Sequence, residues 1–314
     1  FEPVWDARAG AEQLYEAVKV SNLKVEDFEG RKYKRLAQLE ALVAEKRLDN
    51  SFRRTGALPE ERRFGRAGAD SATDAESFAG LCAGSRSRIT GNAGLLPVLD
   101  MGMMPNSNGF LNKEDLDKPE ALWPLQLGFD PETSLVQVIT PIDQEILYGE
   151  DYPVFASIAR SLLDYNREHA EALISELGLG ADSFVVEPGS NDGYLLKVFN
   201  EHDIRTLGID PAPRQADAAN AAGVETLAEF FTREKAQAIA EDRGQADLVI
   251  AKNVVGHVAD QVDFVNGIAT LLRDDGRAVV EFPYVKYIIE NLEFDSVYHA
   301  NSCYFSVKSA AALF

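Results

Sequence analysis

The sequence predicts an α/β fold, with a mostly parallel, doubly wound sheet and helices on both faces over about residues 181–283. Two observations predict this fold class. Apolar runs of strand length alternate with helical stretches, and the first run ends in a glycine-containing turn. The strand-like runs lie at 183–187, 206–210, 247–251 and 277–282, with a shorter one at 226–227. Because helical stretches separate them, the strands are expected to pair in parallel.

The turn after the first strand carries the strongest functional signal. In Glu-Pro-Gly-Ser-Asn-Asp-Gly, Gly189 and Gly193 let the backbone turn tightly against a ligand. Asp210 ends the second strand, 23 residues after Glu187. Nucleotide-type cofactor sites combine such glycines with an acid for the ribose hydroxyls. The turn departs from the dinucleotide Gly-x-Gly-x-x-Gly, so S-adenosylmethionine (SAM) is favoured; a turn that serves packing alone is the alternative.

Composition limits the classes of partner and compartment. The net charge is −20 over 314 residues, which argues against nucleic acid or an anionic membrane as the main partner. Cys82 and Cys303 are the only cysteines, too few for a disulfide scaffold. The first residues do not read as a signal peptide, and no apolar run approaches about 18 residues. These features predict a cytoplasmic protein.

Five parts are expected along the chain. They are a helical N-terminal extension (1–64), a linker (65–77), a small domain (78–150), a connecting helix (151–180) and a Rossmann-like domain (181–314). Leu36, Leu39 and Leu42 give the extension one apolar stripe, and Gly178 predicts where the connecting helix stops. Residues 46–66 hold seven basic and three acidic side chains. That stretch is interpreted as a solvated face, with docking of an acidic, carrier-bound substrate as the alternative.

Four motifs occur in order: Glu187–Gly193, Gly208–Ala212, Lys252–His257 and Glu293–His299. With them, about 235 residues from position 78 onward resemble the bacterial SAM-dependent C-methyltransferases that methylate ketone carbons of nucleotide-linked deoxysugars in antibiotic pathways. The family motifs are Glu-Ile-Gly-Ser-Asn-Asp-Gly, Gly-Ile-Asp-Pro-Ala, Asn-Asn-Val-x-x-His and Glu-Phe-Asp-x-x-Tyr-His. The resemblance implies a zinc domain, a central Rossmann-like class I SAM domain and a C-terminal domain that closes the substrate site.

The cofactor-side residues expected from the motifs and strand ends are Glu187, Gly189, Asn191, Asp192, Gly193, Asp210, Phe230 and Asn253. The expected catalytic residues are Tyr152, His257, Tyr298 and His299, the last two by the resemblance alone. Some alternatives stay open. Phe230 and its neighbour Phe231 suit an adenine site or the core equally well, and His257 suits a base or a buried structural histidine.

The departures from the family concern zinc and the substrate side. The two Cys-x-x-Cys pairs are reduced to Cys82-Ala-Gly-Ser85 and Asp130-Pro-Glu-Thr133, so we expect no zinc. The family's Tyr-His-Glu-His, whose second histidine is thought to act as base, corresponds to residues 298–301 and ends in Asn301. Asparagine is no general base at neutral pH. The family's Tyr-x-Tyr becomes Tyr152-Pro153-Val154.

Three functions are therefore considered. The first in order of preference is a natural-product tailoring enzyme repurposed to another SN2 alkylation, such as intramolecular aziridine formation on a small-molecule or carrier-bound substrate. A SAM-dependent methyltransferase with an altered acceptor is the second, and a non-catalytic scaffold is the third. SAM is the expected cofactor, although its use is left open. Because the family's C-terminal domain does not follow Phe314, we expect a small protein partner to complete the site near Tyr304; a longer tail of the same chain is the alternative.

Overall fold

The computed structural model describes residues 71–112, 119–150 and 152–314, which belong to the second of two compact units, Asp70–Phe314. The predicted N-terminal extension and the basic stretch 46–66 lie outside the described residues. No helix in the described part of the chain is long and apolar enough to cross a membrane.

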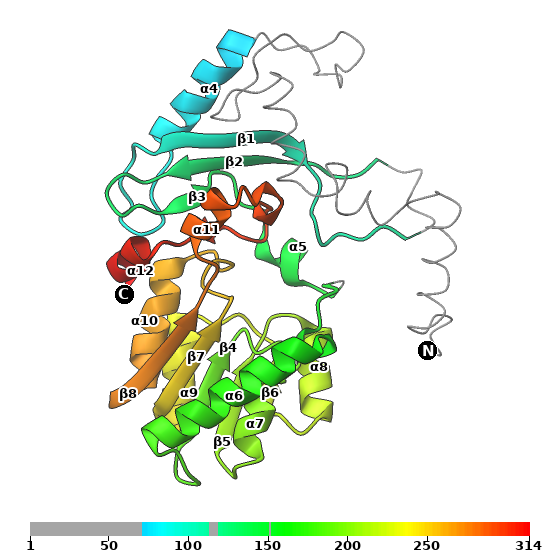
Figure 1. Ribbon diagram of the computed structural model, residues 1–314, viewed down its shortest axis with the longest axis vertical. Helices are drawn as coiled ribbons and strands as arrows, with labels where there is room; N and C mark the ends of the chain where they lie inside the picture. The colour runs from blue at the N-terminus through cyan, green and yellow to red at the C-terminus, as the bar shows by residue number, and fades with distance from the viewer. Residues whose placement is uncertain (1–70, 113–118, 151) are drawn as a thin grey trace. The chain divides into compact units, whose positions relative to one another are not determined.

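Two sheets organise the described residues (Figure 1). The described residues up to 177 contribute α4 (Ser71–Gly84), β1 (Leu96–Met104), β2 (Trp123–Phe129), β3 (Val136–Val138), α5 (Gln144–Tyr148), η3 (Ala156–Ile158) and α6 (Arg160–Leu177). The later residues contribute β4 (Phe184–Pro188), α7 (Leu196–Asn200), β5 (Arg205–Ile209), α8 (Pro213–Ala221), β6 (Thr226–Leu227), α9 (Arg233–Arg243), β7 (Ala246–Lys252), α10 (Gln261–Leu271), β8 (Leu272–Glu281), α11 (Val285–Glu290), η4 (Phe294–Ser296), β9 (Cys303–Tyr304) and α12 (Val307–Leu313).

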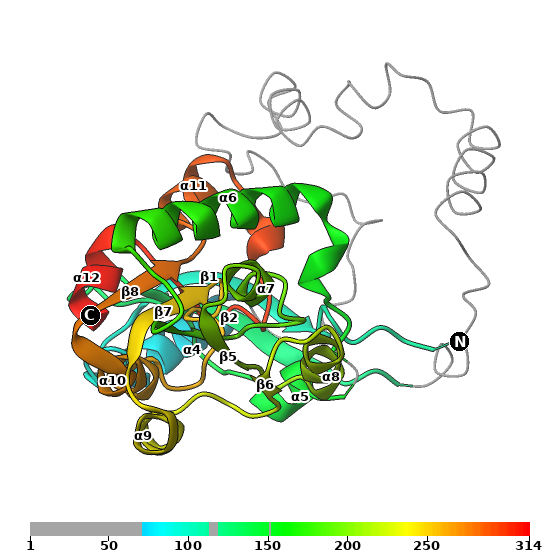
Figure 2. The same ribbon diagram turned by 90° about the horizontal axis from the view of Figure 1, so that it is seen from below.

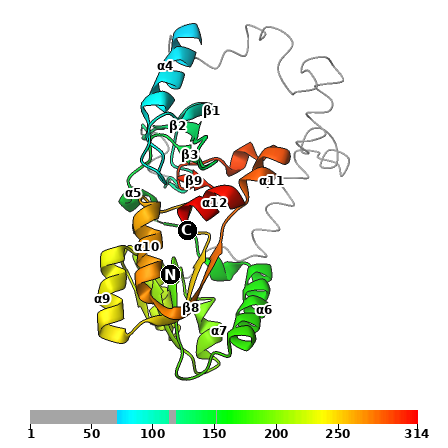
Figure 3. The ribbon, with the colours of Figure 1, turned by 90° about the vertical axis from the view of Figure 1, so that its left-hand side faces the viewer.

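The larger sheet has the order β6-β5-β4-β7-β8, and all of its pairings are parallel. The predicted doubly wound sheet is confirmed. Every residue of the central strand β4 is buried, and successive side chains enter opposite cores: Val186 packs in the cluster with Phe264, Val185 in the cluster with Phe199. Helices α6 and α7 lie on one face, α9 and α10 on the other (Figures 2 and 3). Burial on both faces explains why these strands read as continuous apolar runs.

The smaller sheet has the antiparallel order β1-β2-β3-β9. Its fourth strand comes from the C-terminal part of the chain, where Tyr304 pairs with Val136. The chain therefore leaves the parallel sheet after β8 and returns to the small sheet, so the boundary expected near residue 181 does not separate the two sheets. A two-residue strand has too little periodicity to be predicted from its own sequence.

Two expected boundaries shift in the structure. The linker predicted for 65–77 is wrong from Ser71 onward, because α4 already begins there. The alanines and glutamate of 71–79, with no glycine or proline between them, favour a helix over a linker. The connecting helix begins at Arg160, after η3 and the extended backbone around Pro153, and it ends before Gly178 as predicted.

Candidate functional site

A cavity of about 310 Å³ lies at the carboxyl edge of the parallel sheet. The ends of four strands line it: Gly189 follows β4, Asp210 follows β5, Lys252 ends β7 and Glu281 ends β8. Ligands of open α/β sheets bind at this edge. Helix α5 and the segment after it add a further wall, through Gln144, Tyr148, Tyr152 and Ala156.

The glycine turn is held against the cavity by close packing. Gly189 has φ +74°, and a Cβ added there would lie 2.8 Å from the Cβ of Val254. Gly193 has φ +75°, and its added Cβ would lie 2.9 Å from the Cβ of Val224. Asn191 also adopts a positive φ of 50°. Only glycine satisfies both the backbone angle and the space at positions 189 and 193.

The Asp210 carboxylate is fixed by the backbone. Its Oδ1 accepts a hydrogen bond from the N–H of Ala212 at 3.0 Å, and its Oδ2 accepts one from the N–H of Asn191 at 2.8 Å. Burial raises the pKa of Asp210, and these two N–H groups oppose the rise. Each oxygen keeps a further lone pair. Asp210 and Asn191 both line the cavity, as expected, so the carboxylate has acceptor capacity for a diol-like ligand group.

Three expected cofactor-side residues, Glu187, Asp192 and Gly193, lie behind the cavity wall and do not line it. The Asp192 side chain accepts a hydrogen bond from the N–H of Ser157 at 3.2 Å. The Asn191 side chain does the same for Ala156, at 2.9 Å. Burial raises the pKa of Glu187 well above its usual value. The turn therefore anchors the segment before α6, which in turn lines the cavity.

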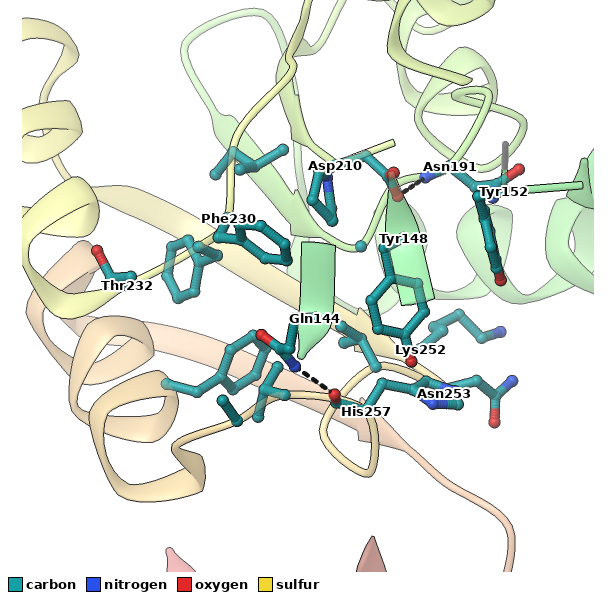
Figure 4. A pocket seen from close by; sticks show the side chains of 18 of the residues that line it. Gln144, Tyr148, Tyr152, Asn191, Asp210, Phe230, Thr232, Lys252, Asn253 and His257 are labelled. Carbon is teal, nitrogen blue, oxygen red and sulfur yellow. Dashed lines mark hydrogen bonds between the residues drawn. The ribbon is translucent and has the colours of Figure 1, made fainter. Parts of the chain in front are cut away.

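The aromatic end of the cavity separates the two adjacent phenylalanines. Both line the cavity, but Phe230 is 36% exposed, whereas Phe231 is 9% exposed and packs edge-on against Phe264 with ring centroids 5.3 Å apart. Phe231 therefore belongs to the core as well as to the cavity wall, and Phe230 has the more accessible ring. In Figure 4, Phe230 and Thr232 lie on one side of Tyr148, and Tyr152, Lys252 and Asn253 lie on the other. The cavity thus has an aromatic end, where Thr232 and Asp263 also lie, and a polar end.

His257 has the geometry of a proton acceptor. Its Nδ1 lies 2.6 Å from the carbonyl oxygen of Ala300, which only accepts hydrogen bonds, so Nδ1 carries the proton and Nε2 keeps its lone pair. Burial lowers the pKa of His257, against the opposing effect of Ala300, and favours the neutral ring. The backbone oxygen of His257 accepts a bond from Gln144 Nε2 at 2.5 Å. Because His257 lines the cavity, the polar end contains a fixed base.

Tyr148 packs against this base, and Tyr152 packs in turn against Tyr148 with ring centroids 5.3 Å apart. The hydroxyl of Tyr148 donates to the same Ala300 oxygen at 2.9 Å, and its ring lies edge-on to His257 at 6.0 Å. Tyr152, expected from the sequence, lines the cavity, and burial followed by the charge of Asp210 raises its pKa to about 12. Tyr148 was not expected. The sequence did contain a signal for it. Asp143 can cap a short helix that begins at Gln144, and Gln144 and Tyr148, four residues apart, then lie on one face of that helix.

The structure does not bring Tyr298 or His299 to the cavity. His299 is 1% exposed and packs edge-on to Trp123 with ring centroids 6.4 Å apart; burial lowers its pKa. Tyr298 donates its backbone N–H to the hydroxyl of Tyr304 at 3.2 Å. The turn into β9 places His299 against Trp123 of the small sheet, and Tyr298 packs in the cluster with Leu147. This turn acts on the cavity wall through its backbone: the carbonyl of Ala300 is hydrogen-bonded to His257.

Further polar residues of the cavity are Asn253, Lys252 and Glu281, and Tyr194, Thr232, Asp260 and Asp263 also line it. Asn253 was expected and adopts a positive φ of 52°. Lys252 and Glu281 were not expected; they form an ion pair with Nζ and Oε2 3.0 Å apart. A lysine that ends a buried apolar strand was the available signal, because a buried charge needs a partner.

In place of the family's zinc ligands the small domain contains a hydrogen-bonded cluster. The hydroxyls of Ser87 and Thr133 donate to Asp130 Oδ2 at 2.7 and 2.6 Å. Cys82 is buried, and burial raises the pKa of its thiol. Among the described residues no group of three or more His, Cys, Asp or Glu side chains is placed to hold a metal ion. Ser87, which the sequence did not single out, joins the two loops.

We expect the purified protein to contain no stoichiometric zinc and to keep its melting temperature in a chelator. Asp130→Ala is expected to lower the free energy of unfolding by about 1–3 kcal/mol, because two buried hydroxyls lose their acceptor. Burial raises the Asp130 pKa, but the bonds from Thr133, Ser87 and the Glu132 backbone lower it overall, so this stabilisation is present above pH 3.8 and is lost as pH falls further.

Denaturant unfolding and elemental analysis check both parts, with the exposed Asp182→Ala as control. One tightly held zinc per chain would contradict the first part, and an Asp130 variant as stable as the control would contradict the second.

Comparison with known proteins gives a consistent family picture. A methyltransferase domain model matches residues 162–314, and a model described as a putative zinc binding domain matches residues 88–148. The C-methyltransferase NovU of Streptomyces niveus is 34% identical over 227 residues, which are 72% of this chain and 54% of NovU. The chain thus spans about half the length of this relative.

Solved structures with similar folds include the YcgJ protein of Bacillus subtilis and a SAM-dependent methyltransferase of Archaeoglobus fulgidus. The first aligns with a TM-score of 0.39 and 16% identity over 46% of this chain and 66% of that chain. The second aligns with a TM-score of 0.38 and 14% identity over 47% of this chain and 66% of that chain.

Proposed function

Because this chain carries a class I methyltransferase fold and is a diverged relative of the C-methyltransferases of antibiotic biosynthesis, we propose that it is a SAM-dependent tailoring enzyme whose acceptor is deprotonated by His257. One observation carries the proposal. The Ala300 carbonyl fixes the proton on Nδ1 of His257, which leaves Nε2 as a base in the wall of the cavity. Loss of the family's second histidine at Asn301 therefore does not leave the site without a base.

The residues present fit SAM. Positive-φ glycine at 189 allows close approach of the backbone, and Asp210 offers acceptors to ribose hydroxyls. Phe230, at the aromatic end, offers a ring face to the adenine. Asn253, Lys252 and Glu281 make the other end polar, as an amino-acid moiety needs. When bound, SAM supplies an electrophilic methyl group.

The chain's own residues would act on the acceptor. Neutral His257 takes the proton from an acceptor O–H, N–H or activated C–H as the new bond to carbon forms. Tyr148 shares the Ala300 carbonyl with His257 and packs against its ring, which limits rotation of the imidazole. Helix α5 and Tyr152 close the cavity beside it, and exclusion of water favours displacement over hydrolysis.

Ring closure is the second candidate, favoured by Asn301 at the position of the family's base. Asn301 donates to the Ser296 carbonyl at 3.3 Å instead of facing the cavity. In this reaction an amine nitrogen of the substrate attacks a carbon of the same molecule. The C–N bond forms, the leaving group departs with its electron pair, and the amine proton goes to His257. No methyl group is consumed.

Product analysis separates the candidates. Wild-type protein is incubated with natural-product intermediates that bear an amine or hydroxyl acceptor, with and without SAM. A product that gains one methyl group and forms only with SAM supports methyl transfer. A product that has lost its leaving group, formed without SAM, supports ring closure. Neither product, together with no binding of S-adenosylhomocysteine (SAH), would contradict both and leave a scaffold role.

Asp210→Ala is expected to weaken SAH binding by roughly 10- to 100-fold, because the carboxylate contributes charge-assisted hydrogen bonds to the ribose. Calorimetry measures the affinity, and Asp217→Ala on the neighbouring α8 is the control. Equal affinities for wild type and Asp210→Ala would remove this carboxylate from the cofactor site.

A further inference from the structure

Lys252 is a buried lysine whose donors are all occupied. Its side chain is 2% exposed, and its ammonium lies 2.6 Å from Asn166 Oδ1, 3.2 Å from His169 Nδ1 and 3.0 Å from Glu281 Oε2. The ring of Tyr165 covers it at 4.4 Å. An ammonium has three N–H donors, so none is left for a ligand. Lys252 therefore joins α6 to the ends of β7 and β8 and holds the Glu281 carboxylate in place.

The Glu281 carboxylate, in contrast, has one oxygen that is poorly satisfied. Its Oε2 is shared by Lys252 and by the hydroxyl of Tyr165, at 2.9 Å. Within residues 71–112, 119–150 and 152–314, its Oε1 has a single contact, from Asn253 Nδ2, at the long distance of 3.5 Å. The side chain is 32% exposed and lines the cavity. A close donor from a ligand would complete the coordination of Oε1.

The charges around Lys252 point to a cationic donor. Glu281 faces the ammonium from β8, and Glu187 lies within its electrostatic reach from β4. Glu187 is 1% exposed, and its Oε2 has no hydrogen-bond partner among the described residues. Burial raises the pKa of Glu187, Lys252 opposes the rise, and the charges of Asp210 and Asp192 add to it. Carboxyl groups therefore outnumber the one ammonium here, so a ligand cation beside Glu281 would enter acidic surroundings.

We propose that Glu281 binds a ligand ammonium group through Oε1, and that Lys252 is the positioning residue for its carboxylate. The inference rests on the proposed function. An ammonium at this site has two sources, the α-ammonium of the cofactor's methionine part or a basic amine of the acceptor. The position is specific to this chain in one respect: the family motif has asparagine where Lys252 stands.

Glu281→Gln tests the site, because the amide keeps the shape and an oxygen for Lys252 but removes the charge. If the cofactor supplies the ammonium, SAH affinity falls roughly 10- to 100-fold, whereas 5′-methylthioadenosine, which lacks the amino-acid part, binds as before. If the acceptor supplies it, SAH affinity is unchanged and the KM of an amine acceptor rises by a similar factor. The control is Glu201→Gln. This change removes the surface ion pair of Glu201 with Arg167, a residue of helix α6, the helix that also contacts Lys252.

A test without substitution guards against a variant that fails to fold. Wild-type protein is titrated with SAH and with an analogue whose α-ammonium is replaced by hydrogen; equal affinities exclude the cofactor source. Lys252→Met should lower the affinity for the ligand that bears the ammonium group and leave the affinity for 5′-methylthioadenosine unchanged. Lys252→Arg should restore the lost affinity. A structural defect would instead weaken SAH and 5′-methylthioadenosine together, which would contradict the positioning role.

The outcomes separate this inference from the proposed function. Wild-type protein that binds no SAH and methylates no acceptor would overturn the proposed function and the ammonium site with it. Wild-type protein that binds SAH and turns over its acceptor, with the affinity and KM unchanged in Glu281→Gln, would overturn the ammonium site alone.

Discussion

His257→Gln is expected to lower turnover by about 100- to 10,000-fold, while SAH affinity stays unchanged. Glutamine is similar to the neutral imidazole in size and polarity, but its amide has no lone pair of useful basicity. The loss therefore falls on the proton transfer and spares the cofactor. Single-turnover kinetics with a saturating acceptor measures it.

The pH dependence gives an independent check. Burial lowers the pKa of His257 from its ordinary 6.5, so the neutral base predominates above that pH. The rate should rise with pH through the lowered pKa and be flat above 6.5, and His257→Gln should lose this limb. His202→Gln, on an exposed loop, serves as the control. Wild-type-like turnover in His257→Gln would assign His257 a structural role.

Tyr148→Phe distinguishes orientation from chemistry at the same site. The phenylalanine keeps the ring contact with His257 but removes the hydroxyl that shares the Ala300 carbonyl. The base remains, so a smaller loss than that of His257→Gln is the consistent result.

The parallel sheet could be predicted because its signals are local. Phe184, Val185 and Val186 form an apolar run that is buried on both faces, and Asp210 ends a strand next to it in space. Residues at the ends of adjacent parallel strands meet at one edge, so Gly189, Asp210 and Asn253 were expected together from order alone. The strand order thus brings residues that are distant in sequence together at the cavity.

The acceptor side could not be predicted in the same way, because it depends on contacts that are distant in sequence. Tyr298 and His299 carry a family motif, but beside the pairing of β9 with β3 the His299 ring packs against Trp123, and Tyr298 packs in the cluster with Leu147. The contribution of that segment is a backbone carbonyl, which no side-chain motif encodes. Tyr148 reaches Ala300 across 152 positions, a contact without any local signal.

Gly189→Ala is expected to cost about 2–5 kcal/mol of unfolding free energy and to weaken SAH binding at least tenfold. Two effects add. The positive φ of 74° disfavours any L side chain, and the new methyl group would lie 2.8 Å from two carbons of Val254. Neither partner is free to move, because Gly189 donates to the Ile209 carbonyl at 2.7 Å and Val254 follows β7 in the cavity wall.

Gly223→Ala separates the two effects. Gly223 has φ +84°, yet an added Cβ there meets nothing within 4 Å, so this variant carries the backbone strain alone. It should lose about 1–2 kcal/mol and keep SAH affinity. Adding Val254→Ala to Gly189→Ala should recover the steric part of the stability loss and leave the strain. Denaturant unfolding and SAH calorimetry on the four proteins measure both quantities.

The expected loss of SAH affinity in Gly189→Ala follows from the part of the turn that would move to relieve the clash with Val254. Relief of a clash at Gly189 requires movement of the turn, and the next residues of that turn hold the Asn191 N–H against Asp210 at 2.8 Å and the Asn191 side chain against Ala156. A shift of a few tenths of an ångström is therefore passed to the carboxylate and to the wall before α6. If Gly189→Ala is no less stable than Gly223→Ala and binds SAH as wild type does, the turn tolerates a side chain, and its glycine serves neither close packing nor a cofactor.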